Sequence, residues 1–164
     1  MFVLRAALRE ALLADAVLAQ QLNFVPDTEP PDTRRAVYIN HLSQFRKINY
    51  PAISIFMDGG VDAHVLFADD IVVSIDVWTS ETADIPGVAY GATGADALYR
   101  RCRALLHQAQ YTAIIPRTTF SVQRFAEIDS SRMEDFDFDQ KLFHIATRYR
   151  ARLIEADAEL LIAN

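Results

Sequence analysis

Hydrophobic residues along the chain follow two periods, and the first of these predicts helices. Between residues 4 and 12, apolar side chains recur every three or four positions, which predicts an amphipathic helix of about three turns. Asp15 is placed to cap a short continuation of that helix through Leu22. The apolar stripe of the first helix consists of Leu4, Ala7, Leu8, Ala11 and Leu12.

A second helical stripe lies in the middle of the chain. Thr93 and Asp96 have the spacing of a capping box, with Asp in place of Glu, so we expect the helix to begin there. We expect Cys102 to be a small buried hydrophobe rather than a reactive thiol. The stripe ends near Gln110 and consists of Leu98, Cys102, Leu105, Leu106 and Ala109, with Arg100, Arg101 and Arg103 on the solvent side.

The second period is an alternation of two, which predicts strands. The clearest strand spans residues 71–78, where one face carries only branched apolar side chains. Residues 37–39 and 51–57 predict two shorter strands. Two more are expected at 119–128 and 142–154, with a polar, acidic connector between them.

This order of helix, strands, helix and strands predicts the fold class. We expect an α+β fold in which a mainly antiparallel sheet of four or five strands is covered on one face by two helices. The opposite face of the sheet is predicted to be polar, and either solvated or in contact with a partner. A length of 164 residues is that of one domain, 1–164.

Charge and cysteine content narrow the classes of function. The chain has 16 basic and 22 acidic residues, a net charge of −6, which disfavours a broad nucleic-acid-binding surface and allows DNA to pass without being held. A single cysteine permits no intrachain disulfide and fits a reducing compartment. Charged residues interrupt the apolar N-terminus, so we expect neither a signal peptide nor a membrane span.

Four segments occur in an order that resembles a known family. The first is the helix at residues 8–22, and the others read DIVVSIDVWT at 70–79, ALYRRCRALLH at 97–107 and LFHIATRYRAR at 142–152. Together they resemble the tail terminator, or tail completion, proteins of long-tailed bacteriophages and related gene transfer particles. The resemblance rests on pattern and order, and it covers most of the chain.

The resemblance implies a structural protein of the virion tail and neck, with no enzymatic activity and no cofactor. Such proteins form a ring, usually of six copies, that caps the tail tube, ends its polymerisation and provides the surface on which the head docks. The implied partners are further copies of the chain, the tail tube protein and the head–tail connector or stopper protein. DNA would pass through without specific binding, and assembly would take place in the host bacterial cytoplasm.

Two alternatives to a tail terminator stay open. One is a connector or stopper protein on the head side of the neck, which would also be small, acidic and ring-forming. The other is a small-molecule-binding enzyme with a pocket between helix and sheet, which would need a cavity with convergent polar groups.

Three arginines form the first candidate for a subunit interface. Arg148, Arg150 and Arg152 fall on one face of the last predicted strand, and the planar guanidinium fork of arginine binds carboxylates at two points. We expect the row to pair with acidic groups of the next subunit. The alternative is an ordinary exposed strand face.

An acidic segment is the second candidate. Glu134, Asp135, Asp137 and Asp139 follow one another closely, but the glycine and the final glutamate of a calcium loop are missing, so no metal site is predicted. The segment is either a solvated hairpin tip or an assembly element that lies at the ring lumen or faces a basic neighbour.

The remaining motifs do not predict a phosphate-binding, metal or catalytic site. The glycine-containing stretch at 87–94 lacks the lysine and hydroxyl of a phosphate-binding loop. The four histidines show no metal-ligand spacing, and we predict no catalytic residue.

Overall fold

The computed structural model of the chain describes residues 2–24, 36–44, 48–57, 68–82, 85–107, 120–137 and 140–155. Strand β3 (Ala68–Ser80) lies in the middle of a five-stranded sheet, between β2 (Ala52–Met57) and β5 (Gln140–Glu155). The short strand β1 (Val37–Ile39) forms one edge and the long strand β4 (Phe120–Asp137) forms the other. Only β1 and β2 run parallel, so the predicted α+β fold with a mainly antiparallel sheet is confirmed.

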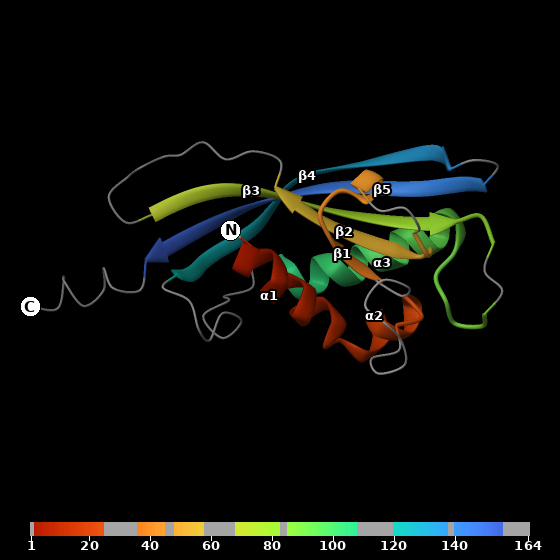
Figure 1. Cartoon of the computed structure of the whole chain (residues 1–164), viewed down its shortest axis with the longest axis horizontal. Coiled ribbons are helices and arrows are strands. Elements are labelled where there is room, and N and C mark those ends of the chain that lie inside the picture. The colour runs from red at the N-terminus through yellow and green to blue at the C-terminus, as the bar shows by residue number, and fades with distance from the viewer. Residues whose placement is uncertain are drawn as a thin grey trace, which may run out of the picture.

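Within the described residues, three α-helices pack on one face of this sheet (Figure 1). They are α1 (Phe2–Leu13), the short α2 (Ala16–Gln21) and α3 (Gly91–Leu106). The predicted stripes of the first and last helices are largely buried, because they meet the apolar face of the strands. The side chains at the centre of this core include Leu8, Leu12, Leu18, Leu98, Leu106, Ile53, Ile55, Val73 and Ile75.

Alternation along β3 decides which side chains face the helices. Ile71, Val73, Ile75 and Val77 are almost fully buried under the helical layer, as the period of two predicts. Each of them lies opposite a residue of β5, from Ala151 opposite Ile71 to Ile145 opposite Val77. The ladder between β3 and β5 therefore presents a mostly apolar surface to the helices, in which Thr147 is a buried polar residue.

The predicted cap at Asp15 is confirmed. Its carboxylate accepts a hydrogen bond of 2.8 Å from the backbone N–H of Leu18, which satisfies one of the free N–H groups in the first turn of α2. Arg101 of α3 donates to both carboxylate oxygens of Asp15, with Nε 2.9 Å from Oδ1. These hydrogen bonds from Arg101 hold the pKa of Asp15 below its ordinary value.

The start of α3 differs from the prediction. The helix begins at Gly91 rather than at a capping box of Thr93 and Asp96, and its N-cap residue Tyr90 makes no side-chain capping bond. Tertiary contacts set this start instead, because Thr79 Oγ1 donates to the Gly91 carbonyl at 2.8 Å. Gly94 has room only for hydrogen, since a Cβ there would lie 2.9 Å from the Ala89 backbone. The helix ends at Leu106, and Ala109 and Gln110 lie outside the described residues.

The sheet face opposite the helices is less polar than predicted. It carries a second buried apolar cluster at the β1 side, to which Leu42, Ile48 and Tyr50 contribute. The cluster consists of Tyr38, Leu42, Ala52, Trp78 and Leu142, with Ile48 and Tyr50 packed against it. Beyond the cluster, described residues of β5 expose a row of charged side chains on this face, at Arg148, Arg150 and Arg152.

Strands β4 and β5 are longer than the sequence predicts. Residues 129–137, expected in an acidic connector, continue β4 and pair with β5 from Arg148 to Gln140. Two register shifts interrupt this ladder, between Val122 and Arg124 and between Glu127 and Asp129. Cross-strand hydrogen bonds thus hold a polar stretch in extended form despite its low intrinsic strand preference.

The main core includes Cys102 and Tyr149, which carry a thiol and a hydroxyl. Cys102 is 2% exposed, and burial raises the pKa of its thiol to about 12. The prediction that Cys102 is a buried residue is confirmed. Tyr149 stacks on Phe125 with ring centroids 4.9 Å apart, and its hydroxyl finds no hydrogen-bond partner among the described residues. Burial raises the pKa of the Tyr149 phenol.

We expect Asp15→Ala to lower the free energy of unfolding by about 1–2 kcal/mol, because both the α2 cap and the contact with Arg101 are lost. Asp15→Asn should lose less, since asparagine also caps helices. Because the pKa of Asp15 is depressed in the folded state, the contribution of its charge is present above the unfolded pKa and is lost as pH falls through the folded value. Urea unfolding from pH 7 to pH 2 tests this, and a constant gap between wild type and Asp15→Asn would contradict it.

Tyr149→Phe should leave stability unchanged or raise it by up to ~1 kcal/mol, because it removes a buried hydroxyl that lacks a partner. Tyr38→Phe is the matched control. Tyr38 as a residue is similarly buried, and its hydroxyl accepts a hydrogen bond of 3.2 Å from the backbone N–H of Asn49, so loss of the hydroxyl should cost about 1 kcal/mol. Chemical denaturation of both variants measures the difference, and a larger loss for Tyr149→Phe would refute this account.

Candidate assembly interface

The three arginines of β5 project from the sheet face opposite the helices. Arg148, Arg150 and Arg152 are exposed, and they alternate with the buried Tyr149 and Ala151. The structure therefore brings the three predicted interface residues together on one accessible strip. We call this strip of three residues the arginine row.

The arginine row is not uniform. Arg148 forms a two-point ion pair with Asp129 of β4, in which Arg148 Nε donates to Asp129 Oδ1 at 2.9 Å. The hydrogen bonds from Arg148 hold the pKa of Asp129 below its ordinary value. Arg150 and Arg152 take part in no ion pair within the described part of the chain.

The pair between Arg148 and Asp129 could not be predicted from the sequence pattern. A regular ladder would not place these two residues opposite each other, but the register shift between Glu127 and Asp129 adds one residue to β4. Bulges of this kind leave no simple pattern in a single sequence, so the partner of Arg148 could be found only from the paired strands.

The acidic segment lies at the closed end of the hairpin formed by β4 and β5. Glu134 is 60% exposed and forms an ion pair of 2.8 Å with Lys141 of β5. Asp135 and Asp137 occupy strand positions opposite Leu142 and Gln140, and Asp139 lies outside the described residues. Within the described residues, the end of β4 thus carries three acidic residues, Glu134, Asp135 and Asp137.

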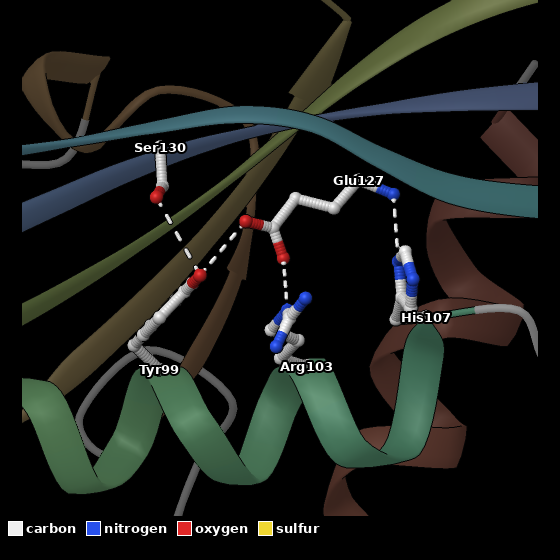
Figure 2. A network of polar contacts seen from close by, with 5 residues as sticks. All are labelled: Tyr99, Arg103, His107, Glu127 and Ser130. Atoms are coloured by element: carbon white, nitrogen blue, oxygen red, sulfur yellow. Dashed lines mark hydrogen bonds and ion pairs between the residues drawn. The ribbon is translucent and has the colours of Figure 1, made fainter.

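A polar network joins α3 to β4 and centres on Glu127 (Figure 2). Its carboxylate accepts hydrogen bonds of 2.7 Å from both Tyr99 Oη and Arg103 Nε, while its backbone N–H donates to His107 Nδ1 at 3.1 Å. Tyr99 Oη also lies 3.5 Å from Ser130 Oγ. Glu127 is only 12% exposed, so this carboxylate is largely removed from water and depends on its partners.

A further polar contact between β4 and α3 lies nearer the start of α3. Arg132 of β4 donates to Asp96 Oδ1 at 2.9 and 3.0 Å, and its guanidinium lies 5.7 Å from the centre of the Tyr99 ring. Beside this pair lies a pocket of about 290 Å³ between the first turns of α3 and the hairpin. Its lining includes the apolar residues Ala95 and Phe143 and the charged residues Asp96, Arg132 and Glu134.

The structure also brings together a polar cluster that sequence analysis left unassigned. Asp76 Oδ2 and His144 Nε2 are 3.3 Å apart, and the His144 ring stacks on Trp78 with centroids 3.5 Å apart. Ser54 lies opposite Asp76 in the ladder, and its hydroxyl has no hydrogen-bond partner among the described residues. The carboxylate and imidazole are 5% and 9% exposed, so a substrate has no direct access to them.

Two further findings bear on the predicted absence of metal and membrane. In the described ranges, no group of three or more His, Cys, Asp or Glu side chains is arranged to hold a metal ion. None of the helices that the structure describes has both the length and the apolar character needed to cross a bilayer.

Comparison with known proteins gives a structural likeness and no sequence family. No family model matches the sequence, and no curated protein matches it. The fold is similar to that of a chain in the virion of a native gene transfer agent particle, with a TM-score of 0.60. The two chains are 19% identical, and the match covers 92% of this chain and 94% of the other. At that identity the likeness establishes a shared fold.

We expect Glu127→Gln to lower the free energy of unfolding by about 1.5–3 kcal/mol, because two charge-assisted hydrogen bonds at a mostly buried site are weakened. The matched control is Glu134→Gln on the same strand. Its ion pair with Lys141 is exposed, so we expect a change of about 0–1 kcal/mol. Equal losses for the two variants in guanidinium unfolding would rule out a special role for Glu127.

Proposed function

We propose that the chain is a structural virion protein, without enzymatic activity, that forms the tail terminator ring of a phage-like particle. In this role copies of the chain close into a ring, six in the usual form of such proteins, on the end of the tail tube. The ring ends tube polymerisation and provides the surface to which the head docks. The observation that carries the proposal is the shared fold with a chain of a gene transfer agent virion over nearly the full length of both.

The distribution of polar side chains supports a structural role. Several side-chain hydrogen bonds connect different secondary-structure elements. Arg101 connects α3 to the cap of α2, and Glu127 connects β4 to α3. Asp76 and His144 form an almost fully buried acid and base pair, and the His144 ring stacks on Trp78 of the second apolar cluster. These groups fix the shape of a subunit, and a ring subunit needs a fixed shape because small errors in the angle between copies prevent closure.

Ring closure requires two different surfaces on each copy. The described part of the chain offers the arginine row on β5 and the acidic end of the hairpin, which are different in charge and lie apart along the same strands. Both free sheet edges are less suited to pair with another copy. Arg9 Nε donates to the Val37 carbonyl of β1 at 3.0 Å, and the register shifts interrupt β4.

The net charge of −6 suits a channel through which DNA moves. A wall of like charge lowers the affinity for phosphate, so DNA is not retained on its way through. The proposal therefore includes DNA as a passing cargo and not as a bound ligand.

Native mass spectrometry over a concentration series, with negative-stain imaging of any oligomer, tests the proposal. We expect a closed ring, and we expect the purified chain to stop the growth of tail tubes when it is added to polymerising tube protein. A chain that stays monomeric both alone and with tube protein would contradict the proposal. A ring that binds the head connector but leaves tube growth unchanged would instead favour the stopper protein of the neck.

A further inference from the structure

The imidazole of His107 connects the end of α3 to the edge strand β4 (Figure 2). His107 is the C-cap of α3, and its Nδ1 lies 3.1 Å from the backbone nitrogen of Glu127. A backbone N–H can only donate, so Nδ1 is the acceptor and carries no proton. The proton of the ring therefore lies on Nε2, and His107 is neutral in this contact.

The N–H that His107 binds lies at an irregular point of the sheet edge. Glu127 pairs with Tyr149 of β5, and a register shift separates it from the next paired residue, Asp129. Because β4 is an edge strand, an N–H there that has no partner within the chain is open to an acceptor from outside. The contact with His107 gives this N–H a partner and ties the last turn of α3 to the strand.

The polar groups around the ring determine what a second proton would do. On α3, Arg103 and Tyr99 both donate to the Glu127 carboxylate, which is the acidic group of this network on β4. On β5, the residue opposite Glu127 is the buried Tyr149. A positive charge on His107 would lie at the carbonyl end of α3, which favours it, and near a carboxylate that offsets the neighbouring guanidinium. Protonation is therefore compatible with the fold, and what it removes is the acceptor for the Glu127 N–H.

Charged groups of the other two helices are engaged elsewhere. On α1, Arg5 and Arg9 donate to acceptors on the β1 side of the sheet, and Glu10 is exposed. At the start of α2, Asp15 is held by Arg101. Within the described residues, the charges that bear on the ring are thus those of the polar network drawn in Figure 2.

We infer that His107 is a pH-sensitive switch, which holds β4 to α3 when it is neutral and releases the strand edge when it is protonated. Imidazole changes its charge between about pH 5 and 8. A doubly protonated ring has two donors and no acceptor, so it cannot bind the N–H of Glu127. The freed N–H then lies on the sheet edge beside the register shift, where a carbonyl group of another chain can bind it. The inference concerns a single copy and does not depend on the proposed ring.

Nuclear magnetic resonance of the full-length, isotope-labelled chain tests the switch. At about pH 8, the spectrum of the His107 ring should show its proton on Nε2. The protection factor of the Glu127 amide, corrected for intrinsic exchange, should fall about tenfold between pH 8 and pH 5, because one hydrogen bond is lost. The Leu18 amide, which is bonded to the Asp15 carboxylate, is the internal reference and should keep its protection over this range.

His107→Asn is the matched variant, because the side-chain carbonyl of asparagine can accept near the position of Nδ1 but does not titrate. Its Glu127 amide should keep its protection at both pH values, whereas His107→Ala should show low protection at both. The two wild-type measurements decide the question if a variant does not fold. A ring proton on Nδ1 at the higher pH, an unchanged wild-type protection factor, or an equal fall in His107→Asn would overturn the inference.

Discussion

The antiparallel ladder between β3 and β5 is the constraint on which the other features depend. Side chains alternate between the two faces of a sheet, so one register sends Ile75 and Tyr149 under the helices and sends Asp76 and Arg150 to the other side. A slip of one residue would exchange the two sets and bury three arginines. The apolar core and the arginine row are thus two results of the same pairing.

Helix α3 is held to the sheet in two ways. Its apolar stripe, with Leu98 and Leu106, packs on β3 and β5, while Tyr99 and Arg103 reach the edge strand β4 through Glu127. Burial supplies most of the stabilisation, and the directional hydrogen bonds fix where the helix lies along the strands. The N-terminal helices are connected to this unit through Asp15 and Arg101, so the three described helices form one layer against the sheet (Figure 1).

Local rules predicted much of the fold and less of the candidate site. Alternation located residues 71–78 as a strand, helical spacing located both long helices, and Asp15 was recognised as a cap because capping is a contact between near neighbours. Contacts between distant segments were not visible. The start of α3 depends on Thr79, the extension of β4 depends on pairing with β5, and Asp76 meets His144 only after the sheet forms. The arginine row was predicted from its spacing. The ion pair between Arg148 and Asp129 was not, because it depends on a β-bulge that no sequence pattern indicates.

The two register shifts in β4 have a consequence for solubility. A long edge strand with a straight row of free N–H and C=O groups would invite pairing with the edge of any other molecule, which is a route to aggregation. Bulges bend and twist such an edge, and His107 already occupies the N–H of Glu127 beside the second shift. The bent edge and the occupied N–H therefore limit open-ended pairing between copies of the chain.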